Sequence, residues 1–462
     1  MSLAARLGSF AAEMRPDDLP NDVAEELKLR LLDQFGAAVS GIESQGWRAF
    51  ECDPAPGLAC IWAMGRQGAA RDAAFLNSFV SHATYMEDGS RFSGGHPASV
   101  VIPAALAAME DDRPGTGADL LAAVATGYEV FLRLGRAVYP EIVRRGFQST
   151  AALGAVAAAA AAASARKLSQ AEASHAIAIA ATTGFGLKHA LKASGSQPLQ
   201  VARACQGGVI ACEAAARGAT GALDILEEGL LPMLGARAEP KMIMKDLGRA
   251  YSVSETYIKL HGGCRGNHAP IDIVQDLIRS SGRTVAEISE IRIAVDSVTH
   301  AADIEHPQTP EQAQFSARFA VAVHLLTGDA LPQRYSEERL SDPVQRALME
   351  RITLMIEPEL DAGYPEQRGA WARIEFIDGE AVDGTRALAR GEPEYPASRA
   401  DIEAKFLRLA GGKLGENAVR LQDLVADLER LSDVRELTAL LGRANPLHSR
   451  STTRTMHLEI QQ

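Results

Sequence analysis

The chain of 462 residues is poor in aromatic residues and has no long run of strongly hydrophobic ones. Aromatic side chains make up 5% of the sequence and hydrophobic residues as a whole 47%, so aliphatic side chains must form most of the core. With 23% charged residues, this composition excludes a disordered chain and is typical of a globular protein. The length exceeds that of one ordinary core, and we expect two or three domains.

Cysteine is also scarce, and the five cysteines form no C-x-x-C motif. Neither a disulfide framework nor a zinc finger follows from them. The N-terminal residues lack the apolar core and the cleavage site of a secretory signal. The most membrane-like run, residues 151–165, consists mostly of alanine and is shorter than the ~20 residues that a membrane span needs. We therefore expect a buried, tightly packed helix there, and a cytoplasmic protein.

Basic residues are in deficit, since 47 lysines and arginines stand against 59 acidic residues and give a net charge of −12. Binding to nucleic acid or to an anionic membrane depends on basic surface, so this balance argues against both as general partners. A local basic pocket for a small anionic substrate remains compatible with it. The chain also lacks a Walker loop, a G-x-G-x-x-G fingerprint, a G-x-S-x-G elbow and metal-ligand clusters, which argues against a nucleotide-dependent enzyme, a hydrolase and a metal site.

The spacing of apolar residues predicts a mainly α protein. Helical patterns cover most of the chain up to about residue 265, and short connections between them favour an antiparallel bundle. Strand-like alternation then appears at 288–298 and 371–377, with a third candidate strand at 352–356 and helices at 310–327 and 340–351. We expect a large helical domain, 1–269 and 400–462, and a smaller α+β lid domain, 270–399, inserted before the C-terminal helices. Helical pattern returns near 398–442, and the other predicted helices are 71–86, 103–111, 118–136, 149–165, 169–182, 200–217 and 221–228.

Two histidines stand in unusual loops. His96 follows two glycines and precedes a proline where a helix is predicted, so its imidazole would lie at a helix N-terminus, which lowers a histidine pKa. His268 ends a glycine-rich loop that also carries Lys259 and Arg265, a pattern that suits carboxylate binding at a helix N-terminus. The alternatives, a helix cap for the first loop and an interdomain hinge for the second, stay open.

Other candidates carry less specific patterns. Lys188 and Lys192 share one helix face, although surface lysines are the ordinary interpretation. Arg144, just before Gln148, could bind a carboxylate through its guanidinium group, or belong to an ordinary basic loop. Acid or base groups also precede the His96 loop, and Cys264 is most simply a passive thiol. These acid or base candidates are Tyr85, Glu87 and Asp88.

Several short motifs in a fixed order resemble the MmgE/PrpD family, which includes 2-methylcitrate dehydratase, cis-aconitate decarboxylase and iminodisuccinate epimerase. No single motif is decisive, but their order and spacing extend over most of the chain. They are Leu19-Pro20, Leu32-Asp33-Gln34-Phe35-Gly36, Ala73-Ala74-Phe75-Leu76-Asn77, His82, His96-Pro97-Ala98-Ser99, Ile102-Pro103-Ala104-Ala105, Gly127-Tyr128-Glu129-Val130, Gly146-Phe147-Gln148-Ser149-Thr150, the loop 259–268 and Phe315-Ser316.

The resemblance implies a helical domain with an α+β lid, a homodimer, and an active site between the two domains. It implies a small di- or tricarboxylate substrate, without a metal or an organic cofactor. His96 and His268 match the two active-site histidines of the family, and Lys259 and Cys264 match further family positions. Arg265 lies in the same matched loop, and we expect it to clamp a carboxylate.

The chain departs from the family pattern at positions that carry charge or protons. Tyr85 replaces the first aspartate of an acidic motif, of which Asp88 keeps the last. Gln148 and Gln200 replace histidines, and Gln197 replaces a lysine. Glutamine is neither a general base nor a cation, so another group must take over these tasks. Lys188, Lys192 or Arg144 could supply the missing positive charge.

We therefore expect a cofactor-independent lyase of the 2-methylcitrate dehydratase type, which removes a proton next to a carboxylate. His96 and His268 would share the acid–base work, with Asp88 and Tyr85 as further catalytic candidates. An epimerase, an isomerase or a decarboxylase starts from a similar stabilised anion and stays open. A catalytically silent carboxylate-binding protein is the alternative from another class.

Overall fold

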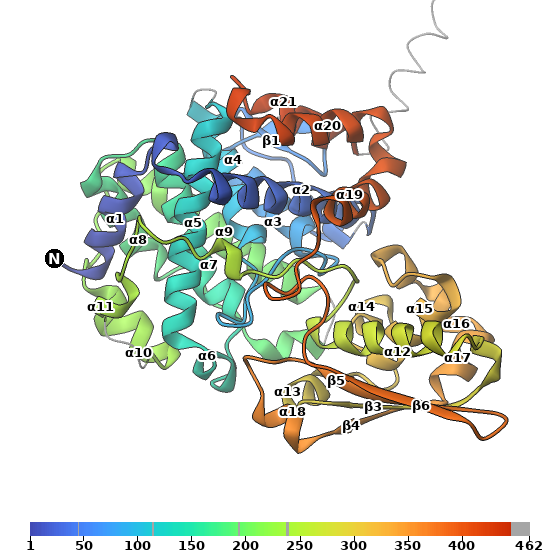
Figure 1. The fold of residues 1–462 in the computed structure, drawn as a ribbon. Coiled ribbons are helices and arrows are strands. Elements are labelled where there is room, and N and C mark those ends of the chain that lie inside the picture. Colours follow the sequence, from blue (N-terminus) through green and yellow to red (C-terminus); the bar gives the residue numbers. More distant parts are fainter. Residues whose placement is uncertain (45, 113–114, 193–194, 237–239, 445–462) are drawn as a thin grey trace, which may run out of the picture.

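The computed structural model describes residues 1–44, 46–112, 115–192, 195–236 and 240–444, without the side chains of residues 112, 191, 192 and 240. Helices predominate, and most of them form a body that occupies the upper and left part of Figure 1. This body contains α1 (Leu3–Glu13), α2 (Asn21–Ser44), α3 (Ala70–His82), α4 (Ala98–Asp112), α5 (Gly117–Val138), α6 (Glu141–Arg144), α7 (Ser149–Ala165), α8 (Gln170–Ala180), α9 (Ser196–Ala216), α10 (Leu231–Leu234), α11 (Pro240–Ile243), α19 (Arg399–Leu414), α20 (Glu416–Ala426), α21 (Arg435–Leu441) and the hairpin β1 (Ala59–Ile61) and β2 (Arg66–Gly68).

The alanine-rich helix α7 lies at the centre of this body, as its composition predicts. Nearly all of its residues are buried, and it packs against α4, α5, α8 and α9. Small side chains let the helices approach closely: a Cβ added at Gly208 of α9 would lie 2.6 Å from the carbonyl oxygen of Ala155. Alanine packing of this kind replaces the aromatic residues that the sequence lacks. Within the described residues, no helix combines the length and apolar character that a membrane span requires.

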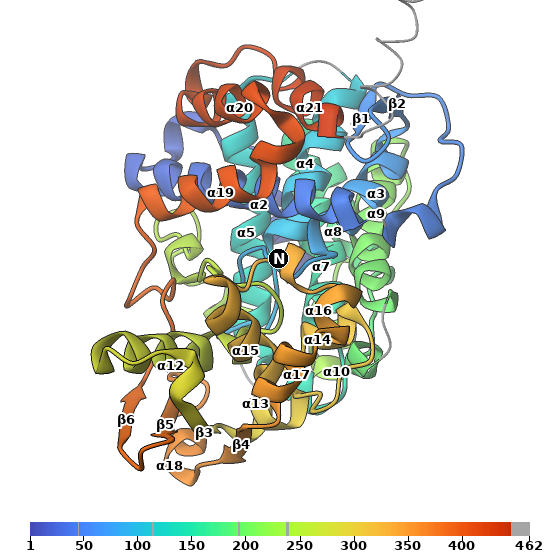
Figure 2. The ribbon, with the colours of Figure 1, turned by 90° about the vertical axis from the view of Figure 1, so that its right-hand side faces the viewer.

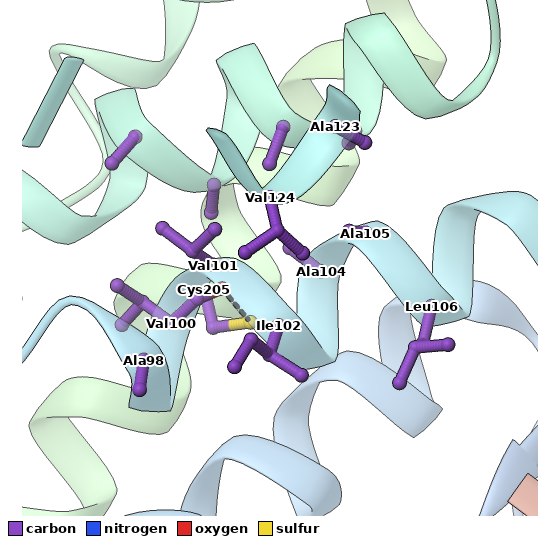
Figure 3. Packing of buried hydrophobic residues seen from close by; sticks show 14 of the residues in the cluster. Ala98, Val100, Val101, Ile102, Ala104, Ala105, Leu106, Ala123, Val124 and Cys205 are labelled. Carbon is purple, nitrogen blue, oxygen red and sulfur yellow. Dashed lines mark hydrogen bonds between the residues drawn. The ribbon is translucent and has the colours of Figure 1, made fainter. Parts of the chain in front are cut away.

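Helix α4 shows how the rest of the core is filled. Figure 3 shows Val100, Val101 and Ile102 of this helix among small side chains, with Val124 and Cys205 beside them. The thiol of Cys205 donates to the carbonyl oxygen of Val100 at 3.3 Å, and burial raises its pKa to about 12. This cysteine is therefore a passive core residue.

A second hydrophobic cluster lies in the lower part of Figures 1 and 2 and combines helices with one sheet. The strand order is β4-β3-β5-β6, with β3 parallel to β4 and antiparallel to β5. The chain then returns to the helical body, where α19 packs against α2. The elements of this part are α12 (His268–Ser281), β3 (Ile288–Val295), α13 (Ser297–Ala302), α14 (Pro310–Ala313), α15 (Ala317–Thr327), α16 (Glu337–Ser341), α17 (Pro343–Met349), β4 (Ile352–Ile356), α18 (Pro358–Ala362), β5 (Ala370–Phe376) and β6 (Ala381–Arg386).

The structure confirms the mainly α class and the three predicted strands, but several predicted helices are divided. The helix expected at 310–327 breaks before α15, because Ser316 caps that helix by accepting the N–H of Phe319. The helix expected at 340–351 breaks at Asp342, which caps α17 ahead of a proline. The helix expected at 71–86 ends at His82, and 221–228 is largely irregular before a short π-helical turn. The strand β6 and the β1–β2 hairpin were not predicted.

Candidate active site

A cavity of about 150 Å³ lies where loops of the helical body meet the second hydrophobic cluster. The loops that follow α3, α5, α8 and α11 line it from one side, and α13, Phe315 and the loop before β5 line it from the other. Its polar lining is Tyr85, Ser90, Arg91, His96, Tyr139, Gln148, Ser149, Lys188, Gln197, Tyr257, Lys259, Cys264, Arg265, Tyr364 and Arg368.

Five cations and no carboxylate side chain stand among the described residues that line this cavity. Two of the five, Arg91 and Arg265, both form ion pairs with the buried Glu392, which follows the sheet in the chain. The Nη1 atom of Arg265 is buried and has no hydrogen-bond partner among the described residues. An anion in the cavity would therefore meet positive charge that the protein itself neutralises only in part.

The loop between α3 and α4 fixes the orientation of His96. Its backbone N–H donates to Thr150 Oγ1 at 3.1 Å, and its ring Nδ1 lies 2.6 Å from the carbonyl oxygen of Asp88. A carbonyl oxygen only accepts, so Nδ1 carries the hydrogen and Nε2 is left with a free lone pair. Burial and, to a smaller extent, the charge of Lys259 together lower the pKa of His96 to about 3. In the ligand-free protein the imidazole is neutral at neutral pH, and its free nitrogen can accept a proton.

A buried carboxylate lies behind His96. Glu87 is fully buried, with Oε1 2.6 Å from Nδ1 of His82 and 3.6 Å from Nδ1 of His96. Burial alone would raise the pKa of Glu87, but the positive charges of His82 and Lys259 outweigh it and lower the pKa to about 2. Glu87 is thus a permanent negative charge beneath the cationic lining.

The ammonium group of Lys259 completes this arrangement. It donates to the backbone carbonyl oxygen of Tyr85 at 2.6 Å, and the side chain is 1% exposed. Burial lowers the pKa of Lys259 to about 8, although the charge of Glu87 opposes this effect. The pKa values of His96 and Lys259 thus lie on opposite sides of neutral pH. At neutral pH His96 is a neutral proton acceptor and Lys259 is a charged hydrogen-bond donor.

Tyr85 adopts a left-handed backbone conformation, φ 50°, which is unusual for a residue other than glycine. Its ring packs edge-on against Phe315 at 5.2 Å between centroids. These two rings also line a second hollow of about 520 Å³. Among the described residues, that hollow carries Glu43, Glu311 and Glu337 but no lysine or arginine, so it does not suit an anion.

Seven of the residues expected at the site line the cavity: Tyr85, His96, Gln148, Lys188, Gln197, Lys259 and Arg265. The structure places three others elsewhere. Asp88 accepts hydrogen bonds from the hydroxyl of Tyr128 and the N–H of Ala98, at 2.7 and 3.2 Å, which directs it into the helical body. Arg144 is exposed and paired with Glu141.

His268 is the third of these residues. It is fully buried and packs against the ring of His261, with 5.4 Å between the centroids, and it does not line the cavity. Neither of its ring nitrogens has a hydrogen-bond partner among the described residues. The side chain of Lys192 lies outside the described residues.

The sequence analysis missed two of the five lining cations, Arg91 and Arg368. Arg91 stands five residues before His96 in the same loop, so its position in the sequence was a usable signal. Arg368 precedes a strand far from any motif, and nothing in the sequence marks it. Among the described residues, no group of three or more His, Cys, Asp or Glu side chains is placed to hold a metal ion.

The fold consists of a helical body and a second part with one small sheet. The cation-lined cavity at their junction suits an enzyme that acts on an anionic substrate. The chain belongs to the MmgE/PrpD family: the N-terminal domain of the family matches residues 5–241, and the C-terminal domain matches residues 261–430. This match confirms the resemblance seen in the motifs.

Two curated relatives cover nearly the whole chain. A cis-aconitate decarboxylase-like protein of Aspergillus oryzae is 27% identical over 96% of this chain and 97% of its own length. A cis-aconitate decarboxylase of Aspergillus terreus is 28% identical over 95% of this chain and 96% of its own length. The chain is accordingly an enzyme, and the family supports a lyase of the dehydratase or decarboxylase type.

Proposed function

We propose that this protein is a lyase that acts on a small di- or tricarboxylate without a cofactor. The observation that carries the proposal is the cavity in which five cations and no carboxylate surround a neutral histidine. Two or three carboxylates would find charge partners there, and charge-assisted hydrogen bonds are roughly twice as strong as neutral ones. A cytoplasmic homodimer remains a prediction from the composition and the family resemblance.

Two groups would carry the proton chemistry. His96 Nε2 takes or returns a proton on the carbon next to a carboxylate, and the bound anion raises the pKa of His96 toward the working range. The ammonium of Lys259 and the guanidinium of Arg265 stabilise the negative charge that develops on that carboxylate. Removal of a proton followed by loss of hydroxide gives dehydration. In decarboxylation no proton is removed first: the bond to the carboxylate breaks, carbon dioxide leaves, and the carbanion that remains takes up one proton.

Cis-aconitate is the first substrate to test, because the relatives that match along the whole chain are named for its decarboxylation. The second is 2-methylcitrate, the substrate of the dehydratase type expected from the motifs. Proton NMR of each reaction follows consumption of the substrate and formation of the product. Running both in deuterium oxide also detects exchange next to a carboxylate when no net reaction occurs.

The His96→Gln variant tests the assigned role of His96. We expect a fall in kcat of about 10²- to 10⁴-fold with little change in thermal stability, because loss of a general base has this cost. His306→Gln is the control, since the side chain of His306 is exposed and does not line the cavity. Full turnover by His96→Gln would overturn the role of His96. Carboxylate binding without turnover or exchange on any substrate would favour the catalytically silent alternative.

A further inference from the structure

The five cationic side chains of the cavity differ in how many hydrogen bonds and ion pairs they form with the protein. Arg91 and Arg265 form ion pairs with Glu392, and Lys259 donates a hydrogen bond to a backbone carbonyl oxygen. The side chain of Lys188, in contrast, has no hydrogen-bond or ion-pair partner among the described residues, although it is partly buried. Arg368 donates one hydrogen bond, from Nε to Thr299 Oγ1 at 3.0 Å. Donors of both side chains therefore remain for a ligand.

Both side chains are carried by segments that the structure holds in place. The backbone N–H of Lys188 donates to the carbonyl oxygen of Gly146 at 2.8 Å, and that of Gln148 donates to the carbonyl oxygen of Gly186 at 2.9 Å. This pairing ties the segment with Lys188 to the loop with Gln148. Lys188 is thus a fixed part of the cavity wall.

Arg368 is held from the opposite side of the cavity. Its guanidinium lies 6.0 Å from the centroid of the Tyr364 ring, and the hydroxyl of Tyr364 contacts the hydroxyl of Tyr139 at the end of α5. The nearest carboxylate to it, that of Asp296, is 3.9 Å away. The contact between the two tyrosines fixes the arginine, which precedes β5, against the helical body.

The charges of Lys188 and Arg368 act on each other. Burial lowers the pKa of Lys188, and the charge of Arg368 lowers it further. Two cations that repel each other in a partly buried place, with no carboxylate between them, gain energy when an anion binds to both. The pair therefore suits a carboxylate as its ligand.

We propose that Lys188 and Arg368 together bind one carboxylate of the substrate, distinct from the carboxylate next to which His96 moves a proton. This inference rests on the proposed function, since it assumes a carboxylate ligand. It assigns a binding place to the second carboxylate of the proposed di- or tricarboxylate substrate, and it identifies Lys188 as the cation that serves in place of the family lysine replaced by Gln197. Because the two residues come from different parts of the fold, a bound carboxylate would also link those parts.

Tricarballylate is a suitable probe, because it is a saturated tricarboxylate with no group to eliminate. Calorimetry measures its affinity for the wild-type protein and for Lys188→Met, Arg368→Met and the double variant. We expect each single variant to bind about 10- to 100-fold more weakly, as for the loss of a hydrogen bond to a charged group. The double variant should lose less than the product of the two effects, since both residues hold one carboxylate.

Arg373→Met is the matched control, because Arg373 lies on β5, close in sequence to Arg368, and pairs with Glu375 outside the cavity. Arg368→Lys and Lys188→Arg should retain most of the affinity, which separates loss of charge from loss of folding. Inorganic phosphate, added as a competitor, shows whether the pair binds any small anion: displacement of tricarballylate at similar concentrations would overturn a carboxylate subsite.

Two further outcomes separate this inference from the proposed function. With a substrate that turns over, the variants should raise KM while kcat stays within a few-fold, the reverse of the effect expected for His96→Gln. Turnover with wild-type affinity in both single variants would overturn the subsite but leave the lyase intact. Weakened tricarballylate binding without turnover of any substrate by the wild type would support the subsite and refute the lyase.

Discussion

The buried carboxylate of Glu87 should control the pH range over which the cavity binds anions. Glu87 is the one carboxylate among the main charges that act on Lys259, and it favours the ammonium form, whereas Lys405 and Arg265 disfavour it. A Glu87→Gln variant keeps a polar side chain of nearly the same shape beside His82 Nδ1, which lies 2.6 Å from the present carboxylate. The substitution therefore removes the charge and keeps the shape.

The size of the effect follows from the position of that charge. A single charge near a titratable group changes its pKa by about 1 to 3 units, each equal to about 1.4 kcal/mol. The wild-type pKa of Lys259 is about 8, so anion binding should weaken as pH rises through 8 and the ammonium loses its proton. In Glu87→Gln, two cations act on Lys259 without the opposing carboxylate, and this midpoint should fall by about 1 to 2 units.

Below this new midpoint, the difference in affinity between the variant and the wild type has the opposite sign. There Lys259 is charged in both proteins, and the variant lacks a negative charge beneath the anion, so Glu87→Gln should bind tricarballylate more tightly than the wild type. Between the new midpoint and about pH 8 it should bind more weakly, because there Lys259 is largely charged only in the wild type. The two curves of affinity against pH should therefore cross.

Calorimetric titrations with tricarballylate from about pH 5.5 to 9 would record both curves. Glu110→Gln is the control, since Glu110 is 2% exposed and contacts Cys60 and Thr438 away from the cavity. Parallel curves for the wild type and Glu87→Gln, with one common midpoint, would refute the assigned coupling between Glu87 and Lys259.

Three further predictions concern stability. Lys405→Met leaves Asp33, 2.5 Å away, as an unpaired buried carboxylate, and should lower the free energy of unfolding in urea by about 3–5 kcal/mol, with partial recovery in a double variant with Asp33→Asn. Gly41→Ala places a Cβ 1.8 Å from a carbonyl oxygen of α3 and should cost about 1–3 kcal/mol in the same assay, whereas Gly411→Ala, with free space around it, should not destabilise. Burial raises the pKa of Glu110 from 4.5 to about 7, so the unfolding free energy should fall as pH rises from 4.5 to 7, and Glu110→Gln should lose this slope.

The sequence predicts the helical body well because its helices carry strong periodic or compositional signals. The alanine run is the clearest case, since alanine favours helix and its small side chain favours close packing. Helix ends were the weak point: a cap such as Ser316 divides a continuous apolar pattern without changing its period. The strand β6 has an exposed or half-exposed pattern with a glycine at its centre, so hydrophobic alternation does not reveal it.

Prediction of the site depended on local motifs. His96 and Lys259 stand in glycine-containing loops whose residue types indicate ligand binding, and both line the cavity. His268 belongs to such a loop as well, yet the chain turns into α12 at that residue and buries the ring beside His261. Arg368 lines the cavity through tertiary packing, which includes its hydrogen bond to Thr299 and the contact of the nearby Tyr364 with Tyr139, and no sequence pattern encodes these contacts.

Most of the residues that depart from the family motifs lie close together in the structure. Tyr85, Gln148 and Gln197 line the same cavity, whereas Gln200 does not and accepts the backbone N–H of Leu187. Gln148 accepts the N–H of Ala151 at 2.5 Å and so caps α7, and the amide nitrogen of Gln197 lies 3.4 Å from His82 Nε2. Both amides are thus engaged with the protein, and neither adds charge or a titratable proton.

Few of the side chains that line this cavity can therefore take up or release a proton near neutral pH. Gln148 and Gln197 carry neutral amides. Of the other lining residues, His96 has a pKa of about 3 and Lys259 a pKa of about 8, on opposite sides of neutral pH. The phenol of Tyr85 holds its proton, because burial raises its pKa. A substrate must therefore bring its own negative charge to make His96 basic, and an acid with one carboxylate would do this less well than one with two or three. Selectivity for polycarboxylates and activation of the base then have the same electrostatic origin.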